Sequence, residues 1–264
     1  MTLGMIYKQA SEDTFRDAAK RKLDFVEFCV NGPDDHEAFL NKVPMIRKWS
    51  EQYSVGVGSI GRWKAEILDS DGNINPAELD LAFRLSDAAE ALGSPNYICG
   101  CNYCEKISFY ANCTKAIEFF SAVLEHCKSY KLKVSTYNCT KMNFVNTPEV
   151  WKIIHGHLPE LGIKYDPSHA VYGGRDYLEE ARDWGDRFQH VHLKGSLMVG
   201  GQRVDDPPAG LDRTDWKTFL SILYAKGYNR GLSIEPHSPV WQGQLGEQGI
   251  DYTISYFRPL IMNP

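Results

Sequence analysis

Short runs of β-branched and aromatic residues alternate eight times with longer segments of helical period along this chain of 264 residues. Such alternation is typical of consecutive strand-helix units, whose strands pair into a parallel sheet. The expected strands cover residues 3–7, 25–30, 55–60, 97–101, 133–139, 162–166, 188–193 and 231–235. Eight units joined by right-handed crossovers close into a barrel, so one α/β domain of (β/α)8 type is expected over residues 1–264.

Helix-capping residues stand between the expected strands. The side chains of Ser11, Asn75, Asn112 and Asp215 can each accept a hydrogen bond from a first helical turn, and Thr147 stands before a Pro, which is favoured there. No linker or low-complexity tract interrupts the series.

Composition excludes several classes of protein. A net charge of -5 and a pI near 5.9 argue against nucleic acid binding, which depends on clustered Lys and Arg. No apolar run approaches the roughly 18 residues of a membrane span, and the N-terminus lacks a signal-peptide pattern. Seven scattered cysteines are an odd number and suggest reduced thiols. A cytoplasmic protein without a membrane partner is therefore expected.

Ligand-type side chains stand at or just past the ends of the last three expected strands. Asp166 and His169 follow one strand, His192 and Lys194 belong to the next, and Glu235 ends the last. The carboxyl ends of barrel strands meet at one rim, so these side chains should converge. Two carboxylates and one imidazole, from Asp166, Glu235 and His192, form a ligand set for a divalent metal.

Alternation along the strands orders the remaining polar residues. His190, His192 and Lys194 are two residues apart and should share one face, with His190 one layer lower. Glu27 lies in an otherwise apolar strand, where an unpaired carboxylate would be costly, so it should be paired within a polar network.

Three motifs together resemble one family. They are Tyr165-Asp166-Pro167-Ser168-His169, His190-Val191-His192-Leu193-Lys194 and Ser233-Ile234-Glu235-Pro236-His237. They are similar to the sugar phosphate isomerase/epimerase group of the xylose isomerase-like (AP endonuclease family 2) TIM barrels. The resemblance implies a divalent Mn, Zn, Co or Mg ion on Asp166, His192 and Glu235. It also implies Glu235 as the base that removes a proton next to a carbonyl, through an enediolate, with His169 and Lys194 assisting.

The fifth strand departs from the family pattern. Where the family has a metal-binding Glu, this chain has Tyr137, which is a poor ligand for a hard cation. Asn138 or a water could fill the position, His169 could move in, or the metal could bind more weakly. In the epimerases this Glu is thought to be the second base. An isomerase or epimerase is therefore expected, with a keto-sugar dehydratase or lyase, or a non-catalytic sugar-binding barrel, as alternatives.

The expected substrate is a small carbohydrate. Aromatic rings near strand ends can stack on sugars, and polar groups can bind hydroxyls or an anionic group. The residues expected to bind substrate are Tyr137, Asn138, His237, Trp241 and Arg203. Whether the sugar is phosphorylated stays open, and the resemblance makes a homo-oligomer plausible.

Overall fold

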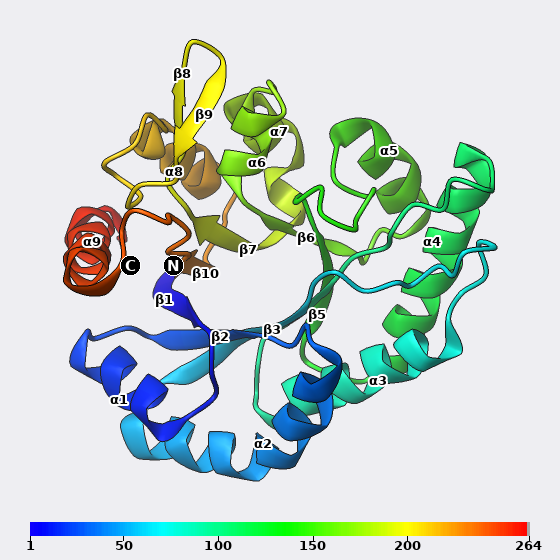
Figure 1. The fold of residues 1–264 in the computed structure, drawn as a ribbon, viewed down its shortest axis with the longest axis horizontal. Coiled ribbons are helices and arrows are strands. Elements are labelled where there is room, and N and C mark those ends of the chain that lie inside the picture. The colour runs from blue at the N-terminus through cyan, green and yellow to red at the C-terminus, as the bar shows by residue number, and fades with distance from the viewer. Residues whose placement is uncertain (263–264) are drawn as a thin grey trace.

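The computed structural model describes residues 1–262, except for the side chains of residues 33 and 34. Eight parallel strands close into a barrel in the order β1-β10-β7-β6-β5-β4-β3-β2 (Figure 1). The barrel strands are β1 Thr2–Tyr7, β2 Phe25–Cys29, β3 Gly56–Arg62, β4 Asn96–Cys99, β5 Lys133–Tyr137, β6 Gly162–Tyr165, β7 Phe188–Leu193 and β10 Gly231–Ile234. The expected (β/α)8 fold is confirmed.

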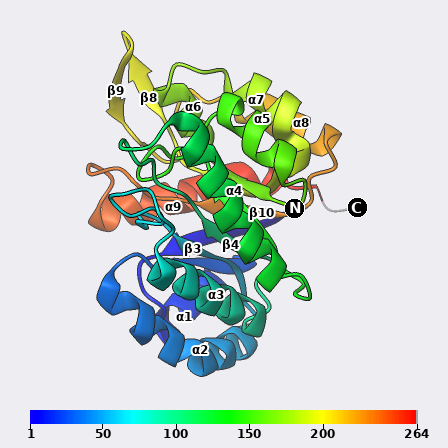
Figure 2. The same ribbon diagram turned by 90° about the vertical axis from the view of Figure 1, so that its right-hand side faces the viewer.

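Helices surround the barrel on all sides (Figures 1 and 2). They are α1 Glu12–Lys20, α2 Pro33–Tyr53, α3 Pro76–Ala91, α4 Phe109–His126, α5 Pro148–His157, α6 Pro167–Tyr172, α7 Tyr177–Trp184, α8 Trp216–Ala225 and α9 Gly243–Phe257, with short 3-10 turns at Gly185–Arg187 and Arg258–Leu260. Ser11, Asn75 and Asp215 cap α1, α3 and α8 as predicted. None of the helices within residues 1–262 combines the length and apolar character that a membrane span requires.

The predicted start of α4 at Asn112 is wrong. The helix begins at Phe109, and Ser108 Oγ caps it by accepting a hydrogen bond of 3.1 Å from Ala111 N. Asn112 is fully buried inside the helix and hydrogen-bonds both the N–H and the carbonyl of Cys104. Its amide therefore satisfies the loop after β4 instead of the helix terminus.

Apolar side chains on the outer face of the barrel pack beneath the helices. The Tyr165 ring stacks on Phe188 with ring centroids 4.3 Å apart and also faces Phe219 of α8. Trp151 and Trp216 are buried in the same layer. Burial of each such ring contributes about 2–3 kcal/mol, and this shell holds the strands in place beneath the rim. All seven cysteines are free thiols, as expected.

A two-stranded antiparallel hairpin, β8 Leu197–Val199 and β9 Gln202–Asp205, follows β7 and projects from the barrel (Figure 2). It leaves from the carboxyl end of β7, directly after Lys194. The hairpin and the loop behind it thus bring Arg203 and Asp206 to the rim.

Candidate active site

Asp166, His192 and Glu235 come together at the carboxyl ends of three neighbouring strands. Asp166 follows β6, His192 lies in β7 and Glu235 follows β10. One ligand atom from each lies within 4.8 Å of the other two. The side chains of Asp166 and His192 are fully buried and that of Glu235 is 16% exposed, so one face of the cluster is open.

Glu27 supports this cluster from inside the barrel. Its carboxylate lies 2.9 Å from His192 Nε2 and 2.8 Å from His190 Nε2. Burial alone would raise the pKa of Glu27, but the two histidines hold it well below its usual range. The predicted pairing of Glu27 is confirmed, and His190 lies below His192 as expected.

The Glu27 contact sets the role of each nitrogen in the His192 ring. An ionised Glu27 accepts a hydrogen bond from Nε2–H, which leaves Nδ1 turned toward Glu235 at 2.9 Å. A carboxylate behind a histidine is the usual support of a metal-binding imidazole, because it fixes the tautomer and raises ligand basicity. The donor set of Asp166, His192 and Glu235 therefore fits a divalent cation.

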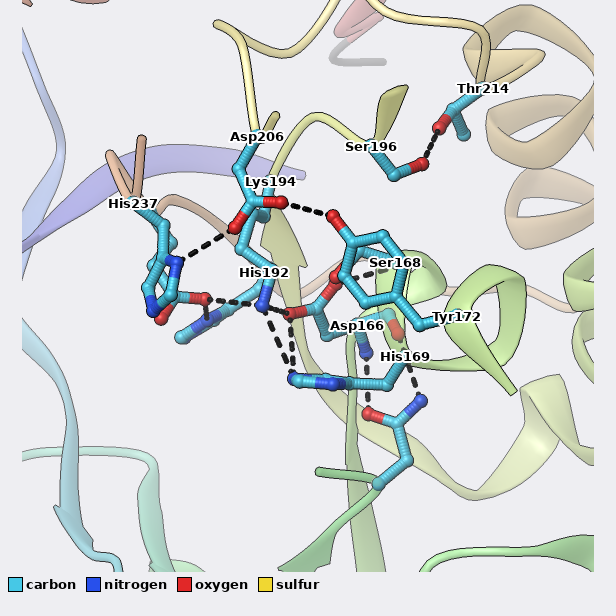
Figure 3. A network of polar contacts seen from close by, with 12 residues as sticks. Asp166, Ser168, His169, Tyr172, His192, Lys194, Ser196, Asp206, Thr214 and His237 are labelled. Atoms are coloured by element: carbon cyan, nitrogen blue, oxygen red, sulfur yellow. Dashed lines mark hydrogen bonds and ion pairs between the residues drawn. The ribbon is translucent and has the colours of Figure 1, made fainter. Parts of the chain in front are cut away.

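Lys194 contacts Asp166 and Glu235, the same two carboxylates that would bind such a cation. Its Nζ lies 2.9 Å from Asp166 Oδ2, 3.6 Å from Glu235 Oε2 and 3.2 Å from His169 Nε2. Figure 3 shows this ammonium group between Asp166 and the His169 ring. Burial would lower the pKa of Lys194, but the two carboxylates raise it, so the side chain is charged at neutral pH.

Burial and neighbouring charges shift the pKa values of Asp166, Glu235 and His169. Burial raises the pKa of Asp166 and Glu235, but Lys194 outweighs this and holds both carboxyls ionised. Burial lowers the pKa of His169 to about 4, although Asp166 acts in the opposite direction. Neutral His169 thus accepts a hydrogen bond from Lys194 through Nε2.

A cavity of about 550 Å³ opens beside the cluster. Glu235, His169 and Lys194 lie on its wall, together with Trp63 and Tyr172. Asp166 and His192 lie behind this wall and are closed to solvent. A cavity of this size and mixed lining suits a small polar ligand.

Tyr137 and Asn138 are adjacent in sequence, but only Tyr137 lines the cavity. Tyr137 lines the cavity, its ring lies 4.9 Å from that of Trp63, and its hydroxyl donates to Lys141 O at 3.4 Å. Burial raises the pKa of Tyr137, so the phenol stays neutral. Asn138 is buried and hydrogen-bonds the Asp166 backbone at both N–H (2.9 Å) and carbonyl (2.8 Å). It therefore positions Asp166 and does not line the cavity.

His237 and Arg203 meet at one carboxylate on the rim. His237 Nδ1 donates to Asp206 Oδ2 at 2.7 Å, and Arg203 Nε donates to Oδ1 at 2.9 Å. Tyr172 donates its hydroxyl hydrogen bond to the same Asp206 (Figure 3). Burial raises the pKa of Asp206, but these donors lower it to about 2. Trp241 instead packs on Gly249 of α9, outside this cavity.

Three cationic residues on the cavity wall were missed from the sequence. They are Lys64, Lys141 and Lys164. The alternation that groups His190, His192 and Lys194 also puts Lys164 on the same strand face as Asp166, so this signal was present. Lys64 and Lys141 lie in loops, where no periodicity applies.

Comparisons with known proteins agree with this fold. A family model described as xylose isomerase-like TIM barrel matches residues 15–260. The "Uncharacterized protein YfiH" of Bacillus subtilis (strain 168) is 27% identical over 123 residues, which are 39% of this chain and 39% of that protein. The chain thus matches well under half of that relative's length.

Solved structures share the fold at low sequence identity. D-psicose 3-epimerase from Clostridium cellulolyticum H10, solved with D-tagatose, has a TM-score of 0.78, 13% identity and full coverage of both chains. 3-Keto-D-glucoside 4-epimerase YcjR from E. coli has a TM-score of 0.77 and 13% identity, covering 98% of this chain and 99% of that one. D-allulose 3-epimerase from Methylomonas sp. has a TM-score of 0.76 and 14% identity, covering 99% and 98%.

Proposed function

Because this chain belongs to the xylose isomerase-like TIM barrel family, we propose that it is a divalent-metal-dependent isomerase or epimerase of a small sugar. The similar solved structures include epimerases of D-psicose, D-allulose and a 3-keto-D-glucoside, so keto-sugars come first among candidate substrates. Asp166, His192 and Glu235 would hold the cation, with Mn, Zn, Co and Mg all compatible with these donors.

One observation carries the proposal: Glu235 is both a member of the ligand cluster and part of the cavity wall. A carboxylate in that place can reach the carbon-bound proton of a sugar in the cavity. Burial would raise the pKa of Glu235, but Lys194 keeps it ionised, as a base must be before it accepts a proton.

The other residues supply binding and charge. The cation, when bound, would stabilise the negative charge that develops on the substrate oxygens after deprotonation. Lys194 adds a fixed positive charge at the same wall, and neutral His169 can exchange hydrogen bonds with a hydroxyl or carbonyl. Tyr137 and Trp63 offer ring surfaces to the sugar.

The test is exchange of carbon-bound hydrogen with solvent. D-fructose, D-psicose and D-tagatose are incubated with the protein and Mn²⁺ in D2O and followed by NMR. Deuterium at a carbon next to the carbonyl, lost in Glu235→Gln and kept in the exposed α4 variant Glu118→Gln, is the expected result. Elemental mass spectrometry of the wild type and of an Asp166→Ala, His192→Ala double variant checks the cation separately. Lack of exchange with every ketose would refute the epimerase proposal for these sugars.

A dehydratase or lyase is the second candidate, and Tyr137 favours it. A two-base epimerisation needs a proton acceptor on each face of the substrate, whereas Tyr137 is a neutral phenol where the family has its other Glu. Elimination of water next to a carbonyl needs only one base and an acid that protonates the leaving hydroxyl. Glu235 and charged Lys194 lie on the same wall and match these roles.

The products separate these reactions. Epimerisation gives an isomer of unchanged mass, whereas elimination gives a product lighter by one water. A purely sugar-binding barrel gives neither, and Glu235→Gln then changes only the ligand affinity.

A further inference from the structure

Lys164 is a buried ammonium group for which the proposed reaction has no use. It lies in β6 between Ile163 and Tyr165, whose side chains pack outward in the apolar shell. Lys164 therefore points to the inside, as Asp166 does two residues later. It is 3% exposed, lines the same cavity as Glu235, and its Nζ lies 5.7 Å from the centroid of the Trp63 ring.

Lys164 differs from the other buried cations in having no carboxylate partner. Among the described residues the buried Lys and Arg side chains are Arg62, Lys164 and Lys194. Arg62 pairs with Glu78 at 2.7 Å, and Lys194 pairs with Asp166 at 2.9 Å. No described side chain forms an ion pair with Lys164. Asp166 and Glu235 feel its charge at longer range, but both already face Lys194.

An unpaired buried ammonium is costly to the folded protein, and one aromatic ring compensates for it only in part. Arrival of an anion would remove that cost. The arrangement is therefore incomplete without an anionic ligand.

The charges on the cavity wall also favour an anionic ligand. Five cationic side chains line the cavity, against the single carboxylate of Glu235: Lys64, Lys141, Lys164, Lys194 and Arg203. Lys194 and Arg203 have carboxylate partners, whereas Lys64 and Lys141 form no ion pair with any described side chain. Both are exposed, so they add long-range attraction from the solvent side.

We propose that Lys164 is the centre of an anion subsite and that the substrate is an acidic sugar derivative, whose carboxylate or phosphate binds Lys164 Nζ. This deepens the proposed function and rests on it, because it assigns the same cavity to sugar. Tyr137 and Trp63 flank the subsite, so the sugar carbons next to the acidic group lie against their rings. A neutral ketose leaves Lys164 without a counter-charge.

A matched set of three open-chain ligands tests the proposal: neutral D-glucitol, its carboxylate D-gluconate, and its ester D-glucitol 6-phosphate. Dissociation constants are measured by isothermal titration calorimetry on the full chain and on Lys164→Met. Trp63 lies beside Lys164, so tryptophan fluorescence gives a second readout. Lys128→Met, at an exposed position just after α4 that is not part of the cavity lining, is the charge-matched control.

We expect at least one anion to bind the wild type about tenfold more tightly than D-glucitol, and Lys164→Met to remove that preference. Tighter gluconate identifies a carboxylate as the ligand group, and tighter glucitol phosphate identifies a phosphate ester. Lys164→Met should melt no lower than the wild type, because it removes an unpaired buried charge. If it does not fold, Lys164→Gln takes its place.

Two results overturn the proposal: anions that bind no better than D-glucitol, or an anion preference that survives in Lys164→Met. The assay measures binding and needs no turnover. Failure of hydrogen exchange with the neutral ketoses therefore refutes the epimerase proposal for those sugars and leaves the subsite standing, whereas a missing anion preference refutes only the subsite.

Discussion

Glu27 Oε1 lies 2.9 Å from His192 Nε2, and this contact joins β2 to β7 across the inside of the barrel, because β1 and β10 separate those strands in the sheet. One buried carboxylate thus fixes the orientation of a candidate metal ligand from the opposite wall. His190, on the same carboxylate, completes the link.

Glu27→Gln should weaken metal binding without removing a ligand. The amide cannot supply the charge that raises the basicity of His192, so Mn²⁺ affinity should fall by about tenfold to a hundredfold. Titration calorimetry with Mn²⁺ measures this, with the exposed Glu118→Gln as control. Unchanged affinity in a folded Glu27→Gln protein would show that His192 needs no such support.

Lys194→Met should separate cation affinity from turnover. The ammonium lies 2.9 Å from Asp166 and repels a second cation there, so its removal should raise Mn²⁺ affinity by about tenfold. Turnover should fall by about a hundredfold, because a fixed positive charge leaves the cavity wall. Calorimetry and NMR exchange rates check the two effects, and a loss of Mn²⁺ affinity would show that Lys194 orders the ligands instead.

His155 makes stability depend on pH. Burial lowers its pKa from 6.5 to about 4, while its Nδ1–H donates to Leu161 O at 3.0 Å. Below pH 6.5 the unfolded chain binds a proton that the folded protein accepts only near pH 4. The contribution of neutral His155 to the free energy of unfolding is therefore fully present above pH 6.5. It falls by about 3 kcal/mol as the pH drops from 6.5 through 4.

His155→Gln keeps a donor but cannot titrate, so its unfolding free energy should lose this part of the pH dependence. Urea unfolding between pH 4 and 7 is the measurement. His157→Gln, on the exposed side of the same helix, is the control. Parallel pH profiles for the wild type and His155→Gln would contradict the prediction.

Gly195 is required by a close approach of two backbone segments. A Cβ at this position would overlap the carbonyl oxygen of Pro207. Gly195→Ala should therefore displace the chain after Lys194, destabilise the protein by about 1–3 kcal/mol and lower activity. Gly156→Ala is the matched control, because nothing lies within 4 Å of its Cβ and Ala favours a helix by about 0.5–1 kcal/mol. Thermal unfolding of both variants tests the contrast.

Periodicity and the fixed geometry of parallel barrels explain why so much was predictable. Once Asp166, His192 and Glu235 are assigned to strand ends, the closed barrel leaves them one common rim. The same logic predicted the pairing of Glu27, since a buried carboxylate must have a partner.

The contacts that the sequence did not predict depend on which of several possible partners each side chain bonds. The amide oxygen and the NH2 group of Asn138 both hydrogen-bond the Asp166 backbone. Asn112 hydrogen-bonds Cys104 in a loop instead of capping the start of a helix. Trp241 packs against α9, although an aromatic residue near a strand end could equally face a ligand. Sequence spacing predicts the region in which such a residue lies but not which of several possible partners its side chain contacts.

Asp206 joins parts of the rim that are far apart in the sequence, because Tyr172, Arg203 and His237 all donate to it. Tyr172 and His237 follow β6 and β10, the same strands that Asp166 and Glu235 follow, whereas Arg203 belongs to the hairpin, which carries no candidate metal ligand. The hairpin can accordingly change in sequence and length while the reacting centre stays as it is. Divergence among relatives in what they bind should be concentrated in this hairpin, and grafting it between relatives offers a route to altered selectivity.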